Sequence, residues 1–179
     1  MTLALVAAPA FAAPSFAECP EGPDHSADIA RIVDQMQAAP HQGAAQGLAA
    51  EMWEIWLDAP DEIAQSMLND GVALLRVGDY LGSRQMLGRL IDYCPNYAEG
   101  YNQRAFSAFL SGDYDAALLD LDSAIALQPV HLGALTGKAL TLIGMGRDAE
   151  AQEVLRAALA INPWLSERAL LDEPPGEDI

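Results

Sequence analysis

A spacing of 34 residues recurs through the middle of this chain. Three prolines are each 34 residues from the next, namely Pro95, Pro129 and Pro163. Three glycines follow the same step, namely Gly78, Gly112 and Gly146. Self-similarity at a fixed period is the signature of an array in which each unit packs on its neighbours. We therefore expect a stack of similar units.

Each period contains two apolar segments of helical spacing with a glycine between them. Gly78-Asp79 and Gly112-Asp113 have the composition of a turn followed by a helix cap, because glycine adopts turn conformations freely and aspartate accepts hydrogen bonds from the first turn of a helix. The proline near the end of each period blocks extension of the second helix. The pattern predicts one helical hairpin per unit.

The chain resembles the tetratricopeptide repeat (TPR) family, whose unit is a 34-residue helix-turn-helix with small residues at fixed positions. The small residues at positions 8 and 20 of the unit are Gly71, Ala105 and Ala139, and Ser83, Ala117 and Ala151. Leu90 departs from the usual alanine at position 27. The resemblance implies an all-α superhelix, a TPR solenoid, with three clear repeats at residues 64–97, 98–131 and 132–165.

The segments on either side of these repeats are also expected to be helical. Apolar residues at helical spacing divide residues 18–61 into an N-terminal segment and a helical hairpin. Stepping back by one period from Gly78 and Ser83 reaches Ala44 and Ala49, so we interpret this hairpin as a degenerate repeat that caps the stack. At the other end, residues 166–179 should form a short capping helix and an acidic tail.

Residues 1–17 have the composition of a secretory signal peptide. They carry no charged side chain and end in Ser15-Phe16-Ala17, with small residues at the positions that signal peptidase requires. The apolar stretch is too short for a stable membrane-spanning helix. We expect export to the bacterial periplasm, with no membrane insertion after cleavage; the alternative is a disordered alanine-rich leader.

Export changes the interpretation of the two cysteines. Cys19 and Cys94 lie 75 positions apart, so they do not form a CxxC redox motif. Two thiols in an oxidising compartment tend to pair. We expect a structural disulfide, and the alternative is one buried and one mobile free thiol.

The charge balance limits the partners of the chain. Nine basic residues against 26 acidic ones give a net charge of −17. Such a surface repels phosphate backbones and anionic membranes, which argues against nucleic-acid binding. The partner should be another protein or a peptide, neutral or basic.

The TPR resemblance implies a concave groove lined by the first helix of each repeat. The groove positions of the family carry over to a mostly apolar set in which Asn102 could hydrogen-bond a peptide backbone. The set is Leu68, Val72, Leu75, Asn102, Phe106, Phe109, Thr136, Leu140 and Ile143. We expect the groove to receive a peptide or helix of a partner protein. Two alternatives stay open: the terminal helices of the chain fill the groove, or the chain is a structural subunit of an envelope complex that uses its convex face or caps.

Catalysis is not expected. The sequence contains no GxSxG, HExxH, P-loop or GxGxxG motif. His25 and His41 have no second ligand at metal spacing, so we expect neither a metal nor a cofactor. His131 should cap a helix or pack on the preceding repeat, and Arg104 should pair internally with Glu99 or Asp120.

Overall fold

A computed structural model describes residues 18–172 of the chain. Residues 1–17, where we expect a signal peptide, and residues 173–179, which hold most of the acidic tail, lie outside the described residues. The described part is all-helical, as the repeat pattern predicts. Its elements are α1 (Ser26–Gln37), α2 (Gln42–Trp56), α3 (Glu62–Arg76), α4 (Tyr80–Tyr93), α5 (Ala98–Leu110), α6 (Tyr114–Leu127), α7 (Leu132–Gly144), α8 (Asp148–Ile161) and the 3₁₀ helix η1 (Ser166–Leu170).

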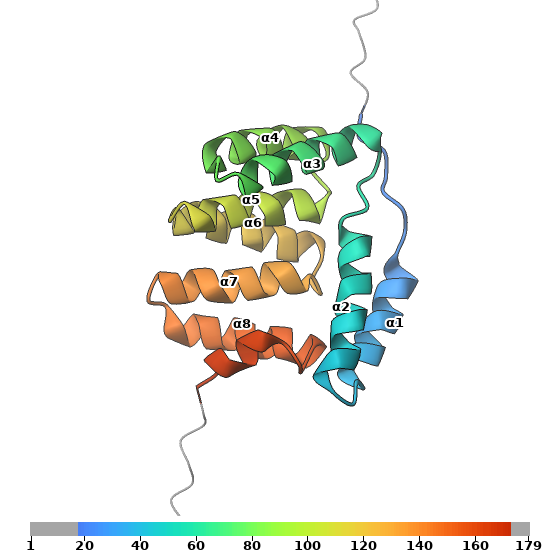
Figure 1. Ribbon diagram of the computed structural model, residues 1–179, viewed down its shortest axis with the longest axis vertical. Helices are drawn as coiled ribbons and strands as arrows, with labels where there is room; N and C mark the ends of the chain where they lie inside the picture. Colours follow the sequence, from blue (N-terminus) through green and yellow to red (C-terminus); the bar gives the residue numbers. More distant parts are fainter. Residues whose placement is uncertain (1–17, 173–179) are drawn as a thin grey trace, which may run out of the picture.

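Three helical hairpins, α3–α4, α5–α6 and α7–α8, stack along the molecule (Figure 1). The turn glycines Gly78, Gly112 and Gly146 have φ values of +79°, +79° and +72°, a region that other residues rarely adopt. Asp79 and Asp113 then cap α4 and α6 by accepting hydrogen bonds from backbone amides. The predicted solenoid of three repeats is confirmed.

Small residues allow the two helices of a repeat to approach closely. A Cβ atom added to Gly71 of α3 would lie 2.6 Å from Cγ of Leu87 on α4. Ser83 and Ser107, both fully buried, join α4 to α5 through a hydrogen bond of 2.7 Å between their hydroxyl groups. Close packing within and between the units therefore depends on small side chains, two of them (Gly71 and Ser83) at positions that the repeat pattern marks and one (Ser107) at a position that it does not mark.

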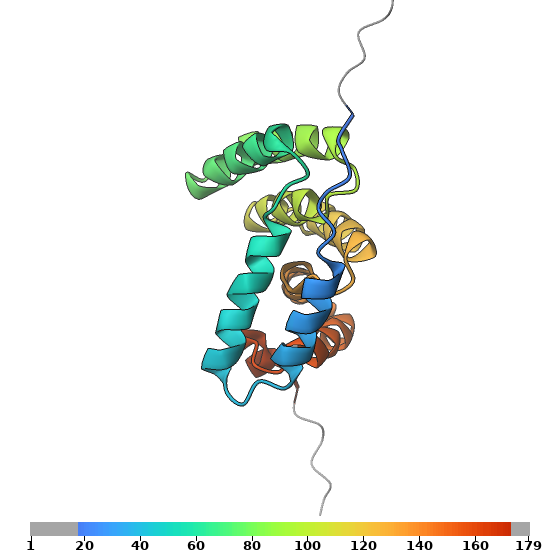
Figure 2. The ribbon, with the colours of Figure 1, turned by 90° about the vertical axis from the view of Figure 1, so that its right-hand side faces the viewer.

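The N-terminal hairpin α1–α2 forms as predicted, but it does not stack on α3 as a further repeat. It runs across the stack, along the edge where the first helices begin and the second helices end (Figures 1 and 2). Gln37 donates a hydrogen bond to the carbonyl of Ala160 in α8, and Trp164 donates one to the carbonyl of Ala39. We call α1–α2 the crosswise hairpin.

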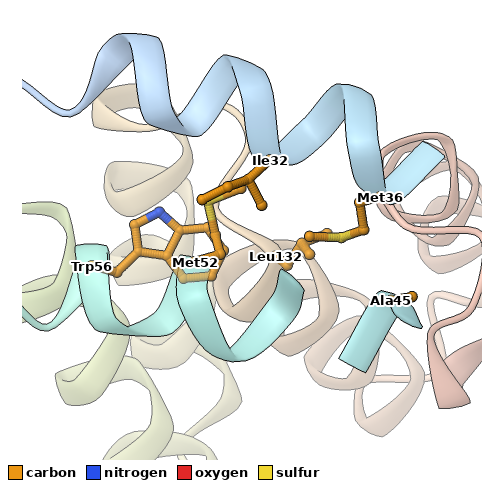
Figure 3. Packing of buried hydrophobic residues seen from close by; sticks show 6 residues of the cluster. All are labelled: Ile32, Met36, Ala45, Met52, Trp56 and Leu132. Carbon is orange, nitrogen blue, oxygen red and sulfur yellow. The ribbon is translucent and has the colours of Figure 1, made fainter. Parts of the chain in front are cut away.

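A separate hydrophobic core explains this placement. Ile32 and Met36 of α1 pack with Met52 and Trp56 of α2 and with Leu132 at the start of α7 (Figure 3). Trp164 also packs against this cluster. These large apolar side chains are buried by lying across α7 and the C-terminal segment, which a stacked repeat on α3 could not reach.

The C-terminal cap is a single 3₁₀ helix, η1. Gln152 of α8 holds it by donating to the carbonyl of Leu170 and accepting from the amide of Asp172. Among the described residues, no helix combines the length and the apolar character required to cross a lipid bilayer.

A disulfide joins Cys19 to Cys94, with Cα atoms 5.2 Å apart. It ties the extended residues 18–25, which we call the N-terminal arm, to the end of α4. His25 fixes the other end of the arm by a hydrogen bond of 3.1 Å to Asp58 in the loop after α2. The arm therefore follows the same edge of the stack as the crosswise hairpin.

Candidate functional site

The first helices of the three repeats surround a cavity on the concave face, with a volume of about 410 Å³. We call it the concave cavity. Its walls are mainly apolar, and most of its lining comes from α5 and α7. Phe106 is 48% exposed, so a large aromatic surface faces solvent here. Such a surface in a folded chain is typical of an interaction site.

Seven of the nine groove residues expected from the sequence line this cavity. They are Val72, Leu75, Asn102, Phe106, Phe109, Thr136 and Leu140. Residues from three successive repeats are thus brought to one surface by the helical spacing and the stacking.

Leu68 was expected in the groove, but it is fully buried in the core between α3 and α4. It shares its face of α3 with Ala64 and Gly71, which lie at i−4 and i+3 and are also buried. This face packs on Leu87 and not on the concave side. Ile143 was also expected in the groove, but it is exposed in the last turn of α7 and is not among the residues that line the cavity.

Asn102 is at the wall but is only 6% exposed, and its amide already has a partner. Its Nδ2 donates to Oε2 of Glu99 at 3.0 Å. The same oxygen lies 2.9 Å from Nε2 of His131, and Gln103 donates to the other oxygen of Glu99. Asn102 is therefore part of a buried polar network that joins α5 to α7. It has this structural role in addition to the binding role expected for it.

His131 connects this network to the crosswise hairpin. Its Nδ1 accepts from the amide of Ala134 and so caps α7, as expected from the sequence. Its ring stacks on Trp56 of α2, with centroids 4.2 Å apart and planes 10° apart. One buried imidazole thus fixes the start of α7, the carboxyl group of Glu99 and the position of α2.

Trp53 is a wall residue that the repeat pattern did not reveal. It comes from α2 and lines the concave cavity together with residues of α7. A Cβ atom on Gly133 would lie 2.7 Å from Cη2 of Trp53, so the glycine makes room for the indole. The chain's own N-terminal hairpin therefore contributes part of one wall and leaves the rest of the cavity open. The one feature of the sequence that could have indicated a large side chain here was Gly133, a glycine near the start of a helix.

Charged groups near the concave cavity are mostly engaged with one another. Arg104 donates to both oxygens of Asp120, at 2.8 and 2.6 Å, which links α5 to α6 as one of the expected internal pairs. These hydrogen bonds raise the pKa of Arg104. Arg76 is the guanidinium that lines the cavity itself. In the part of the chain that the structure describes, the cavity thus offers an apolar wall with one cationic hydrogen-bond donor.

Tyr97, at the edge beside the crosswise hairpin, has its hydroxyl group in a negative environment that is largely shielded from water. Burial, with the nearby charges of Glu99 and Asp58, raises the pKa of Tyr97 far above its ordinary value. The neutral hydroxyl group of Tyr97 donates to the carbonyl of Trp56 at 2.8 Å.

In residues 18–172, no group of three or more histidine, cysteine, aspartate or glutamate side chains is arranged to hold a metal ion.

Comparison with known proteins agrees with this geometry. Residues 108–167 match the tetratricopeptide repeat family. A TPR repeat-containing protein of Rhizobium etli is 39% identical over 54 residues, which cover 30% of this chain and 26% of that protein. The chain spans between 26% and 38% of the length of the curated relatives that it matches.

Solved structures show the same superhelix. The first TPR of Spaghetti (RPAP3) bound to the HSP90 peptide SRMEEVD is similar with a TM-score of 0.58 and 19% identity, over 60% of this chain and 85% of that one. The TPR2B domain of yeast Sti1 in complex with an Hsp70 peptide is similar with a TM-score of 0.56 and 25% identity, over 60% and 89%. The family match, the relatives and the stacked hairpins together show that this chain folds as a tetratricopeptide-repeat solenoid.

Proposed function

We propose that this chain is a non-catalytic protein-interaction module that binds an apolar peptide or helix of a partner protein in its concave cavity. The observation that carries the proposal is the open apolar wall formed by Val72, Phe106 and Leu140 from three successive repeats. Structurally similar TPR domains in complex with peptides support it. Burial of the partner's apolar side chains would supply the binding free energy.

The closure of one wall by Trp53 limits how the partner can lie. The occupant has to pack against α2 at that wall, so a short segment with one or two apolar side chains fits better than a long helix that crosses the whole face. Arg76 would donate hydrogen bonds to backbone carbonyl groups of the occupant. A cavity of about 410 Å³ is within the range of about 300–1,000 Å³ that is typical of ligand sites.

We also propose that the mature protein works in the periplasm. The apolar leader at residues 1–17 and the Cys19–Cys94 disulfide support this compartment. Expression of the full chain in a bacterial host with fractionation and mass spectrometry tests it. We expect a periplasmic product that begins at Glu18, whereas a full-length cytoplasmic product would contradict export.

Site-specific photo-crosslinking tests the concave cavity directly. A photoreactive phenylalanine analogue at Phe106 should form adducts with a partner in intact cells of the native host. The matched control position is Leu119 on α6, which is 71% exposed and does not line the cavity. Adducts at Phe106 alone would support the cavity. Adducts at Leu119 alone would favour a structural subunit that uses its convex face, and would overturn the proposal.

A further inference from the structure

A second and larger cavity lies on the other side of the crosswise hairpin. It has a volume of about 1,480 Å³ and shares no lining residue with the concave cavity. The N-terminal arm, α1 and the loops that follow α2, α4 and α6 enclose it. We call it the arm cleft. Its volume exceeds the range of about 300–1,000 Å³ that is usual for small-molecule sites, so it has room for a peptide.

The rim of the arm cleft is strongly acidic. Six exposed carboxylates line it, namely Glu18, Glu21, Asp24, Asp34, Asp58 and Asp92. Among the described residues, no lysine or arginine lines the cleft. The two histidines in this part of its lining already contact carboxylates: His25 lies 3.1 Å from Asp58 and His131 lies 2.9 Å from Glu99. The rim is therefore complementary to a positively charged ligand.

The floor of the arm cleft is apolar and contains a buried donor without an acceptor. Val33, Ile55 and Leu127 form part of this floor, and Leu127 is 39% exposed. Trp56 also lines the cleft and is only 5% exposed, yet its Nε1 has no hydrogen-bond partner within residues 18–172. Figure 3 shows this nitrogen on the edge of the indole that faces α1, which is a wall of the cleft. A buried N–H group without an acceptor is rare in folded proteins.

We propose that the arm cleft binds a short basic segment of a partner protein. Its lysine or arginine side chains contact the acidic rim, its aliphatic side chains cover the floor, and one backbone carbonyl enters beside α1 to accept the hydrogen bond of Trp56 Nε1. This site does not depend on the concave cavity, and either one can bind its ligand without the other.

Calorimetric titration of the full chain with a designed peptide tests the arm cleft. The probe is a capped pentapeptide that alternates leucine with lysine and arginine, and the control peptide carries glutamate and aspartate in their place. We expect the basic peptide to bind in a 1:1 ratio, with an affinity that falls as salt is added. The acidic peptide should not bind.

Two variants locate the binding. Asp34→Asn with Asp92→Asn should weaken it about tenfold by removing rim charges, and Trp56→Phe should weaken it about fivefold by removing the donor while keeping an aromatic ring against His131. The carboxylates of Asp34 and Asp92 are exposed and accept no hydrogen bond from another described residue, so this variant should fold normally. Its matched control is Glu54→Gln with Glu153→Gln, which changes the net charge equally at exposed sites outside the cleft.

The outcomes separate the two cavities. Unchanged binding in the control pair and in Phe106→Ala, with weaker binding in both cleft variants, supports the arm cleft. The proposal is overturned if the basic peptide does not bind, if the charge control weakens binding as much as the rim variant, or if Phe106→Ala abolishes binding and so assigns the peptide to the concave cavity.

Discussion

The repeat stack and the crosswise hairpin are both helical, but they are held in place in different ways. In the stack, contacts join helices of the same repeat or of adjacent repeats, as Gly71 meets Leu87 within one repeat. The hairpin instead contacts residues more than a hundred positions away, as Gln37 binds the carbonyl of Ala160. Only the first kind of contact repeats with a period. The second kind depends on a few individual side chains, so single substitutions should show how much each one contributes to holding the hairpin on the stack.

The largest effect should come from the buried residue that joins the two regions. His131→Ala removes the contact with Glu99, the cap of α7 and the stack on Trp56. Loss of one partner from a buried pair typically costs about 3–5 kcal/mol, because the other group stays desolvated. We expect a loss of this size in the free energy of unfolding, measured by urea denaturation.

The control for this substitution is His41→Ala. His41 also caps a helix, by accepting from the amide of Ala44, but it is exposed. Loss of a cap alone costs about 0.5–2 kcal/mol. If both variants lose the same stability, the buried network contributes nothing beyond capping, and the strong link between hairpin and stack is refuted.

The disulfide should have the next largest effect. Cys19 and Cys94 are 75 residues apart and enclose the whole crosswise hairpin, so their link restricts the unfolded chain strongly. A disulfide of this kind stabilises by about 2–4 kcal/mol. Urea denaturation with and without reductant should show this difference, and reductant should have no effect on a Cys19→Ser/Cys94→Ala variant. No difference in the native chain would mean that the arm adds nothing to stability.

A smaller effect is expected where the hairpin meets the concave cavity. Gly133→Ala would place a Cβ atom against the rigid ring of Trp53, and overpacking of this kind costs about 1–3 kcal/mol. The control is Gly47→Ala in α2, which has nothing within 4 Å of the added atom. That change should stabilise by about 0.4–1 kcal/mol through the unfolded chain. Thermal unfolding should show a lower melting temperature for Gly133→Ala and a higher one for Gly47→Ala. A change in the same direction for both variants would contradict the close contact.

The stack could be predicted from sequence because its determinants recur. Pro129, Gly112 and Ala117 each have counterparts one period away, and each reports a local constraint on a turn or on a close contact. Seven of the nine expected groove residues followed from the same register, and Leu68 and Ile143 are the exceptions. Leu68 lies on the face of α3 that packs on α4, which the consensus position does not reveal because the helix phase is decided by packing.

The place of the crosswise hairpin could not be predicted in this way. Its apolar pattern gives two amphipathic helices, but an amphipathic face does not say which surface it will cover. The residues one period before Gly78 and Ser83 suggested a further repeat in the stack. In the structure, however, Trp56 and Met52 pack in the hydrophobic cluster that contains Leu132. The contribution of Trp53 to the concave cavity and the existence of the arm cleft both follow from this placement, so neither was visible in the repeat register.

The smallest expected effect concerns pH at the junction between the two regions. Asp61 caps α3 by accepting from the amide of Ala64 at 2.8 Å and accepts from the hydroxyl group of Tyr93 at 2.7 Å. These hydrogen bonds, the backbone one first, lower the pKa of Asp61 in the folded state. A lowered folded-state pKa means that the unfolded chain binds the proton more readily. This stabilisation is therefore present above the ordinary carboxyl pKa and is lost as the pH falls through the pKa of the folded state.

Asp61→Asn should therefore flatten the acidic limb of stability against pH. Tyr93→Phe should flatten it only in part, because the backbone hydrogen bond remains. Urea midpoints measured from neutral to acidic pH compare the three proteins, and identical acidic limbs would show that the junction is held by apolar contacts alone.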